Sequence, residues 1–348
     1  MSSKGRRYNR YAEPKLNMKK VLGVIVAILV IIMVIVSIVN VIKNGEDKKK
    51  VKSYSYYTVY ENGKFGVINN EGETVINPEY TEIVLIPNKD VPIFICTYDL
   101  NDQDGTYKTK VINQKNEEIF KEYSKVEAID NFDSKQNIWY EDDVLRVEKD
   151  GKYGLINFEG KEVLPCDYDE ITALKGVTNN LLVKKDGKVG LVNEKGQTIV
   201  NTEYKDIKTL KEGYKNEYII VNDNNQYGII STTGTVIIEP KYEDVKYLNN
   251  SEMFAIKDAG VWKLINKDNQ ILIDGGYDNI IEAKGENVVV EKGGKYGVVT
   301  TKNEEKIPVE YEQIKYTFSI YYIAKTGGKY GIINLNNEQV KDSLCFAR

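Results

Sequence analysis

A short motif occurs twice in the C-terminal part of the chain, thirty-four positions apart. It reads GGKYG at 293–297 and again at 327–331. Related cores stand earlier in the chain: GKFGVIN at 63–69, YKTKVIN at 107–113, GKYGLIN at 151–157, GKVGLVN at 187–193, NQYGIIS at 225–231 and GVWKLIN at 260–266. Repetition at a nearly constant period is typical of an array of small, similar folded modules.

The spacing is rigid within a repeat and variable between repeats. When Gly66 of the first core is the reference, the equivalent positions are 66, 110, 154, 190, 228, 263, 297 and 331. The residue fourteen positions later is a tyrosine in six of the eight units: Tyr80, Tyr168, Tyr204, Tyr242, Tyr277 and Tyr311. The second unit has Tyr123 one position early, and the last has Cys345. This pattern predicts one domain, residues 54–348, of about eight modules joined by tolerant loops.

Each unit has the pattern of β-strands. In FAIKDAGVWKLINKDNQILIDGGYDNIIEAK (254–284), four short apolar stretches rich in branched residues are separated by turn residues. The first turn is a pair such as Asn62-Gly63 or Asp186-Gly187, which accepts the positive φ angles of a two-residue hairpin. The second runs from an asparagine to a glycine three residues later, as from Asn69 to Gly72. We therefore expect an all-β domain with no long helix.

Two positions of the core have predicted structural roles. The reference glycine lies within a strand, where it lets a neighbouring backbone or ring approach closely. The aromatic residue before it is expected to pack against the next unit, because repeated aromatics at structural spacing usually belong to a core. These aromatic residues are Phe65, Tyr153, Tyr227, Tyr296 and Tyr330.

The units resemble the WG (KWG) repeat of many bacterial surface-associated proteins. The resemblance covers residues 56–345. It rests on a K-aromatic-G-aliphatic-aliphatic-Asn core and a later aliphatic-aliphatic-x-Pro-x-Tyr-acidic-x-aliphatic segment, both present in GKFGVINNEGETVINPEYTEI (63–83). Phe or Tyr usually replaces the family's tryptophan, Lys263 follows the one aligned tryptophan, and the unit at 91–139 is longer and eroded. The resemblance implies a β-propeller-like assembly that binds rather than catalyses.

Burial of apolar surface leads to a similar expectation. A four-stranded sheet of about 30 residues cannot bury both faces alone, so the units must stack on one another. Closing the stack into a ring protects its ends, which predicts a seven- or eight-bladed β-propeller; an open, curved array is the alternative. The last unit stops near Arg348 without a fourth strand, so we expect residues Val51–Tyr56 to supply it.

The N-terminal segment has the composition of a membrane anchor. Residues 21–39, VLGVIVAILVIIMVIVSIV, carry no charge and as a helix would extend roughly 28 Å, the hydrocarbon thickness of a bilayer. We therefore predict a basic cytoplasmic tail at 1–20, a single transmembrane helix at 21–42 and a linker at 43–53. Seven Lys or Arg residues precede the apolar run and five lysines follow it closely, so the positive-inside bias favours a cytoplasmic N-terminus and an extracytoplasmic C-terminal domain.

Charge and missing residue types exclude several functions. Residues 1–20 have a net charge of +6, so the whole-chain charge of −4 leaves −10 for the rest, the wrong sign for nucleic acid. The chain has no histidine, which removes Ser-His and Cys-His nucleophilic sites and every histidine-containing metal site. Its three cysteines, Cys96, Cys166 and Cys345, form no CxxC pair. The sequence therefore predicts no catalytic, metal-binding or cofactor-binding residue, and no cofactor.

Two acidic segments have a weak resemblance to functional sites. Residues 99–105, DLNDQDG, resemble a calcium loop, but Leu100 occupies the first ligand position, which favours a solvated loop. The triplet Glu141-Asp142-Asp143 offers half of a glycosidase carboxylate pair. Because carboxylates are scattered through every loop, we interpret it as a solvated loop between blades.

Two functions remain after these exclusions. The first is a membrane-anchored binding or scaffold module, not an enzyme, that recognises a protein or a cell-envelope glycan through the propeller surface. Its 26 tyrosines suit such contacts, because tyrosine combines a flat apolar ring with a hydroxyl group. The alternative is an envelope carbohydrate hydrolase that uses paired carboxylates on the central face. Three or more acids around an apolar pocket would favour the hydrolase, and a shallow tyrosine-lined face would favour binding.

Overall fold

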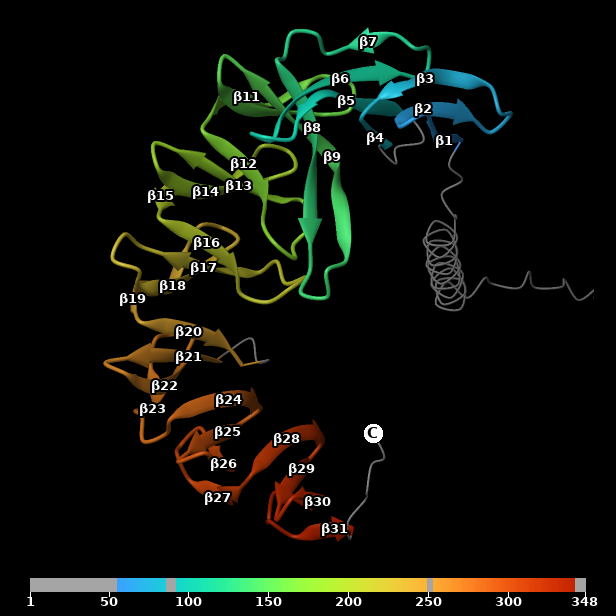
Figure 1. Ribbon diagram of the computed structural model, residues 1–348. Coiled ribbons are helices and arrows are strands. Elements are labelled where there is room, and N and C mark those ends of the chain that lie inside the picture. Colours follow the sequence, from blue (N-terminus) through green and yellow to red (C-terminus); the bar gives the residue numbers. More distant parts are fainter. Residues whose placement is uncertain (1–54, 86–91, 249–252, 342–348) are drawn as a thin grey trace, which may run out of the picture. The chain divides into compact units, whose positions relative to one another are not determined.

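The described part of the protein consists of β-strands and turns. The computed structural model describes residues 55–85, 92–248 and 253–341, all within the second of the two units into which the chain divides, Ser55–Arg348. These residues form 31 strands and no helix (Figure 1). Among them no helix is long and apolar enough to span a bilayer, and the predicted membrane segment 21–42 lies outside the described residues.

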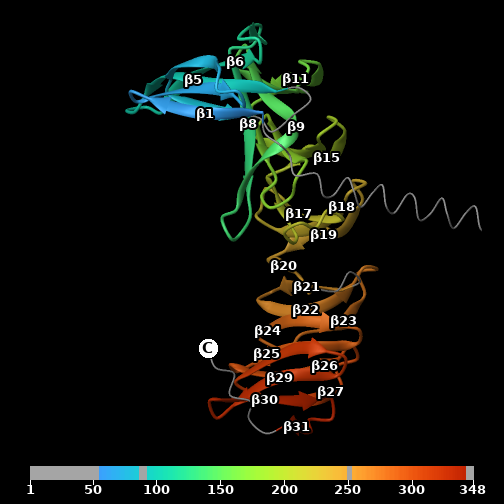
Figure 2. The same ribbon diagram turned by 90° about the vertical axis from the view of Figure 1, so that its right-hand side faces the viewer.

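The strands form eight antiparallel sheets that follow one another in chain order (Figures 1 and 2), numbered here sheet 1 to sheet 8. Sheet 1 contains β1 (Tyr56–Glu61), β2 (Lys64–Asn69) and β3 (Thr74–Tyr80). Sheet 2 contains β4 (Glu82–Leu85), β5 (Ile93–Asn101), β6 (Thr106–Asn113) and β7 (Glu118–Ile119). Sheet 3 contains β8 (Lys125–Phe132), β9 (Ile138–Lys149), β10 (Lys152–Ile156) and β11 (Glu162–Tyr168). Sheet 4 contains β12 (Glu170–Ala173), β13 (Asn180–Lys185), β14 (Lys188–Asn193) and β15 (Thr198–Tyr204).

The second half of the domain repeats this arrangement. Sheet 5 contains β16 (Asp206–Thr209), β17 (Glu217–Val221), β18 (Tyr227–Ser231) and β19 (Val236–Tyr242). Sheet 6 contains β20 (Asp244–Tyr247), β21 (Met253–Asp258), β22 (Val261–Asn266) and β23 (Ile271–Ile273). Sheet 7 contains β24 (Asn279–Lys284), β25 (Asn287–Lys292), β26 (Lys295–Thr300) and β27 (Glu305–Tyr311). Sheet 8 contains β28 (Gln313–Phe318), β29 (Tyr321–Thr326), β30 (Lys329–Asn334) and β31 (Gln339–Lys341).

The sheets do not coincide with the repeats as the sequence divides them. Each of sheets 2 to 8 takes its first strand from the end of the preceding repeat; β24, for example, ends the unit 254–284 but begins sheet 7. Sheet 8 is therefore complete, and the sheet with three strands is the first. Tyr56 belongs to β1, where it pairs with Asn69 of β2. Tyr56 therefore does not complete the last unit as expected, because the sequence period does not reveal where a sheet begins; Val51–Tyr54 of the same predicted segment lie outside the described residues.

The predicted turns are confirmed. Asn62 and Gly63 join β1 to β2 with φ angles of 49° and 79°, the left-handed conformations that a tight hairpin requires. In the next turn the side chain of Asn69 accepts hydrogen bonds from the backbone N–H groups of Glu71 and Glu73. The N–H of Gly72 bonds to the carbonyl of Asn69. The sheets are therefore built from locally encoded hairpins.

The reference glycine marks an irregularity in the pairing of sheets 1, 3, 4, 5, 7 and 8. Opposite Gly228 the pairing of β18 with β19 shifts register, and the outer strand comes so close that a Cβ on Gly228 would lie 2.4 Å from the carbonyl oxygen of Ile238. Gly66 and Gly154 have the same environment, with distances of 2.5 and 2.6 Å to the equivalent carbonyl oxygens. The predicted close approach of a neighbouring backbone is confirmed, and only glycine fits without a shift.

The hydrophobic core is divided among the contacts between consecutive sheets. In one cluster Leu155 of sheet 3 packs with Val192 of sheet 4, whereas Ile156, the next residue after Leu155, packs on sheet 2. Successive residues of a strand point to opposite faces, so one aliphatic pair connects a sheet to both neighbours. Tyr153 packs in the same cluster as Leu155, and the equivalent aromatics Phe65, Tyr227 and Tyr296 also contact the following sheet, as predicted.

The reference glycines provide a test of this architecture. We expect Gly228→Ala to lower the free energy of unfolding by about 3 kcal/mol, because the new methyl group overlaps the backbone of β19. The matched control is Gly331→Ala in sheet 8, where the nearest atom to an added Cβ lies 3.7 Å away. Thermal or denaturant unfolding followed by circular dichroism measures both. Equal effects of the two substitutions would contradict the close approach.

Candidate binding pockets along an extended hairpin

The longest hairpin of the described domain lies in sheet 3. Its strands β8 and β9 have 8 and 12 residues, whereas the corresponding strands β12 and β13 of sheet 4 have 4 and 6. Figures 1 and 2 show this hairpin extending beyond the other strands of its sheet. Its first strand and its tip fall in the long, eroded unit that the sequence distinguishes at 91–139, and β9 continues to Lys149. The irregular repeat therefore contributes an extra structural element.

The acidic triplet lies in this hairpin and not in a loop between blades. Glu141 is in the middle of β9 and only 2% exposed. Its Oε1 accepts a hydrogen bond from Asn131 Nδ2 (2.9 Å), and its Oε2 accepts one from the backbone N–H of Asn179 (2.6 Å). Burial raises the pKa of the Glu141 carboxyl. The predicted loop is wrong, because the length of β9 and the packing of sheet 4 against it could not be read from the local sequence; Asp142 and Asp143 are solvent-exposed as predicted, and Glu141 is not.

Buried hydrogen bonds fasten the hairpin to the following sheets. Asn131, 1% exposed, donates from Nδ2 to the carbonyls of Leu174 and Val177 and accepts from the N–H of Gly176. These three residues belong to the loop between β12 and β13 of sheet 4. At the hairpin tip, Ser134 donates its N–H and its hydroxyl to the carboxylate of Glu212, which follows β16 of sheet 5. The hairpin thus contacts two successive sheets.

The base of the hairpin lines a cavity of about 490 Å³, which we call the Arg146 pocket. Such a volume is in the range of ligand-binding sites. The pocket is lined by strands and turns of sheets 2 and 3: Thr81, Glu82, Ile95, Thr97, Leu100, Gly105, Tyr107, Thr109, Glu127, Ala128, Asp130, Ile138, Tyr140 and Arg146.

A fixed ionic network forms one wall of the Arg146 pocket. Glu127 accepts hydrogen bonds from Arg146 Nη2 (2.6 Å) and from the hydroxyl of Tyr107, and Lys125 Nζ lies 2.9 Å from it. Lys125 also lies over the Tyr107 ring, 3.6 Å from its centre. Burial by itself would raise the pKa of Glu127, but Arg146, Tyr107 and Lys125 together outweigh it and lower that pKa. Glu127 is thereby held in its ionised form.

Another part of the lining is apolar and accessible. Leu100, Ile138 and Tyr140 are 46%, 71% and 39% exposed. Glu82 and Asp130 line the same pocket. Burial is the main cause that raises the pKa of Tyr140, and the charges of these two acids add to it. The Arg146 pocket therefore combines exposed apolar side chains with two acids outside the ionic network. The sequence did not identify any of these residues as a site residue. The one sequence feature that marked this region was the excess length of the second unit.

The segment that resembles a calcium loop forms the turn between β5 and β6. Asp99 is paired with Lys108 at 2.9 Å, and Asp104 accepts hydrogen bonds from the N–H and hydroxyl of Thr106. Within the described residues there is no group of three or more acidic or cysteine side chains that could hold a metal ion. The carboxylates of this turn stabilise the hairpin itself.

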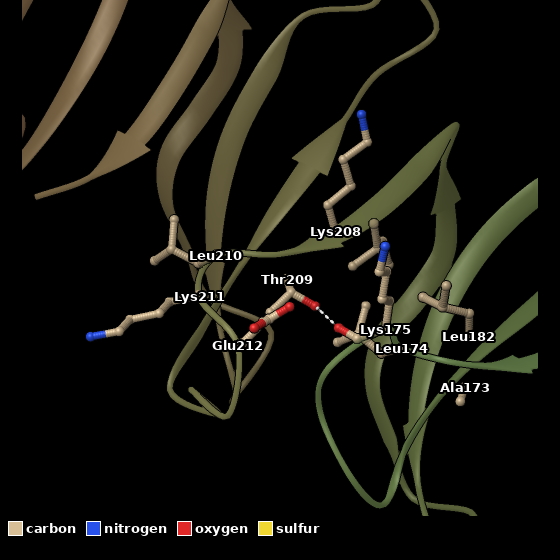
Figure 3. A pocket seen from close by; sticks show the side chains of 10 residues that line it. Ala173, Leu174, Lys175, Leu182, Lys208, Thr209, Leu210, Lys211 and Glu212 are labelled. Atoms are coloured by element: carbon tan, nitrogen blue, oxygen red, sulfur yellow. Dashed lines mark hydrogen bonds between the residues drawn. The ribbon is translucent and has the colours of Figure 1, made fainter. Parts of the chain in front are cut away.

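A second cavity, of about 480 Å³, lies between sheets 4 and 5, and we call it the Lys208 pocket (Figure 3). Its lining comes from strands β12, β13 and β16 and the segments that follow β12 and β16: Ala173, Leu174, Lys175, Leu182, Ile207, Lys208, Thr209, Leu210, Lys211 and Glu212. The hydroxyl of Thr209 donates to the carbonyl of Lys175 and joins the two sides. The lining therefore consists of aliphatic side chains and three lysines, with one carboxylate.

The eight consecutive sheets define an all-β tandem-repeat protein. A family model identifies the repeat. The model described as "WG containing repeat" matches residues 65–88, 153–188, 190–227 and 227–262. The chain thus contains WG repeats, which confirms the resemblance drawn from the repeated core. The long hairpin tip and residues 263–348 lie outside the matched stretches.

Comparison with other proteins gives only distant similarities. No curated protein matches the chain. Among solved structures, a eukaryotic initiation factor shares 10% identity with a TM-score of 0.38, over 83% of this chain and 85% of its own. BamB from Moraxella catarrhalis shares 9% identity with a TM-score of 0.29, over 75% and 86%. The Pan2 WD40 domain from Neurospora crassa shares 13% identity with a TM-score of 0.27, over 60% and 76%.

The ionic network of the Arg146 pocket predicts a pH-dependent contribution to stability. We expect Glu127→Gln to lower the free energy of unfolding by about 2 kcal/mol at pH 7, because Arg146 loses its charged partner. The pKa of Glu127 is lowered from 4.5 in the folded protein, so its contribution is present above about pH 4.5 and disappears as the pH falls through the lowered value.

Denaturant unfolding of both proteins between pH 7 and pH 3 measures this difference. Glu71→Gln, in an exposed turn of sheet 1, is the matched control and should change stability by less than about 0.5 kcal/mol at every pH. A cost of Glu127→Gln that is equally large at pH 3 would exclude an ionised Glu127.

Proposed function

We propose that this protein is a membrane-anchored binding module whose Arg146 pocket recognises a protein or glycan of the cell envelope. One observation carries the proposal: Leu100, Ile138 and Tyr140 expose large apolar surfaces around a cavity of ligand size. Exposed apolar patches on folded proteins usually mark interaction sites. Threonine hydroxyls, Glu82 and Asp130 in the same lining supply hydrogen-bonding groups that orient a ligand.

The state of the carboxylates supports binding over catalysis. Three acids, Glu82, Glu127 and Asp130, line the Arg146 pocket, which is the feature that favours the alternative of an envelope carbohydrate hydrolase. A glycosidase needs one carboxyl group that keeps its proton near neutral pH. Glu127 has the opposite character, since its two cationic neighbours and Tyr107 lower its pKa. Only Glu82 and Asp130 remain for a catalytic pair.

The anchor and the orientation complete the proposal. The uncharged run at 21–39 and the basic residues before it support a single-pass helix with the N-terminus in the cytoplasm. The repeat domain would then face outward, attached through the linker 43–53. This arrangement would bring the Arg146 pocket to the compartment in which envelope polymers and surface proteins are found.

We further propose that sheets 1 and 8 pack together and close the array into a propeller. At the contacts between inner sheets, the first of the two aliphatic residues that follow the reference position faces the next sheet, and the second faces the previous sheet. Leu155 of sheet 3 and Val192 of sheet 4 meet in this way. At the two ends of the domain one member of this pair is incompletely buried: Ile68 in sheet 1 and Ile332 in sheet 8. The outer faces of sheets 1 and 8 therefore each expose one half of the aliphatic contact that joins all other neighbouring sheets.

Ring closure predicts an energetic coupling between the end sheets. We expect Ile68→Asp and Ile332→Asp each to lower the free energy of unfolding by about 1–2 kcal/mol, and their effects to be non-additive by at least about 0.5 kcal/mol. A double-mutant cycle from denaturant unfolding measures the coupling. Two small and strictly additive effects would support the open array, in which both positions face solvent.

The binding function predicts both localisation and capture. We expect the full chain to fractionate with membranes and a variant lacking 21–42 to be released. The soluble fragment Ser55–Arg348 should sediment with isolated cell envelope, and the double variant Leu100→Ser/Tyr140→Ser should lose at least about tenfold in affinity, because it removes two apolar contacts. Ile281→Ser, also at an exposed hydrophobic residue but in β24, is the matched control.

Two outcomes would contradict this proposal. Equal envelope binding by the fragment and the Leu100→Ser/Tyr140→Ser variant would exclude the Arg146 pocket. Release of sugar fragments from the envelope that depends on Glu82 and Asp130 would instead establish the hydrolase.

A further inference from the structure

The Lys208 pocket is separate from the Arg146 pocket and has the opposite charge character. The two cavities share no lining residue. We propose that the Lys208 pocket binds an anionic group, a phosphate or carboxylate, that is attached to a short apolar segment. This inference rests on the proposed binding function and names a ligand class for a second site of the same domain.

Two lysines from neighbouring sheets supply the positive charge. Lys175 follows β12 of sheet 4, and Lys208 lies in β16 of sheet 5. Both are exposed, and Lys175 forms no ion pair within the described part of the chain. Lys208 has a long contact of 3.7 Å with Asp206, and its ammonium lies 5.1 Å from the centre of the Tyr227 ring. Figure 3 shows Lys211 pointing away from these two lysines, so Lys175 and Lys208 are the groups we assign to the anion.

The one carboxylate of the lining is already occupied. Glu212 Oε1 accepts a hydrogen bond from the N–H of Ser134 at 2.5 Å, and Oε2 accepts one from its hydroxyl at 2.8 Å. The Lys175 ammonium lies over the Phe132 ring, 4.6 Å from its centre. The hairpin that carries Phe132 and Ser134 therefore contacts the Lys175 ammonium and holds the Glu212 carboxylate in hydrogen bonds. A positive site in an otherwise acidic domain attracts anions selectively.

The remaining lining is aliphatic. Leu174 and Ile207 are almost fully buried and form the floor, and Leu182 and Leu210 are half-buried beside them. An ion alone would leave this surface wet, whereas a ligand with a few methylene groups gains about 0.8 kcal/mol for each one that it buries. The pocket therefore suits an amphipathic anion better than inorganic phosphate.

The probe for the test is butyl phosphate, compared with inorganic phosphate and butanol. Titration calorimetry is done on the full chain in nanodiscs of phosphatidylcholine, with empty nanodiscs as the blank. We expect the double variant Lys175→Gln/Lys208→Gln, which removes both positive charges, to bind butyl phosphate about tenfold more weakly than the unaltered protein. Lys302→Gln, at an exposed lysine of the turn between β26 and β27, should bind within twofold of the unaltered protein. Both substituted lysines are exposed, so the melting temperature should stay within about 2 °C.

Comparing the three probes separates the contribution of the negative charge to the affinity from that of the apolar contact. Inorganic phosphate and butanol should each bind at least about tenfold more weakly than butyl phosphate. Equal affinity of the double variant and the unaltered protein for butyl phosphate would overturn the proposal, and so would equal affinity for butanol and butyl phosphate. Neither result affects the envelope-binding test, which depends on Leu100 and Tyr140 in the other pocket.

A further experiment identifies whether the bound anion is a lipid headgroup or a soluble molecule. Nanodiscs that contain phosphatidylglycerol offer the same chemistry as a lipid headgroup. A weaker apparent affinity of the unaltered protein for butyl phosphate in these discs than in neutral discs, with no such difference between the discs for the double variant, would indicate that a lipid reaches the pocket. Unchanged affinity would indicate a soluble phosphate ester as the ligand.

Discussion

The contact between consecutive sheets is the interaction on which the rest of the domain depends. A sheet of three or four short strands cannot stay folded by itself, since half of its apolar surface would face water. Two adjacent aliphatic residues resolve this, because they point to opposite faces and join each sheet to both neighbours, as Leu155 and Ile156 do. The same pair joins each of sheets 2 to 7 to both neighbours, so the core of the domain is a series of layers between consecutive sheets.

Local chemistry explains how much of this arrangement the sequence predicts. The hairpins could be predicted because Asn-Gly and Asp-Gly pairs and the Asn-to-Gly turns encode backbone conformation within four residues. The close approach at Gly66 and Gly228 followed from the absence of a side chain inside a strand. The boundary of a sheet could not be predicted, because a periodic sequence has no marked beginning. The burial of Glu141 depends on Asn131 and on the loop of another sheet, neither of which is near it in the pattern.

The Arg146 pocket lies where the repeat is least regular, and the same irregular hairpin reaches the edge of the Lys208 pocket. A regular unit offers the same side chains at every sheet and cannot by itself distinguish one position of the array from another. The second unit departs from the pattern, and its long hairpin adds Glu127, Tyr140 and Arg146 to one cavity and places Phe132 and Ser134 beside the other. The regular units form the scaffold, and in the proposed function the irregular unit supplies the recognition surface. Motif comparison with single repeats could not locate it, because the tip of the hairpin has no equivalent in the other units.

The hairpin tip also affects how the domain would come apart. In an array whose modules touch only their neighbours, opening spreads from one module to the next, and the ends open first. The hydrogen bonds from Ser134 in sheet 3 to Glu212 in sheet 5 bypass sheet 4. Sheet 4 is enclosed between two partners that are also joined to each other, which opposes its opening on its own. We therefore expect sheets 3 to 5 to open as a cooperative block, with amide exchange slowest and most uniform there.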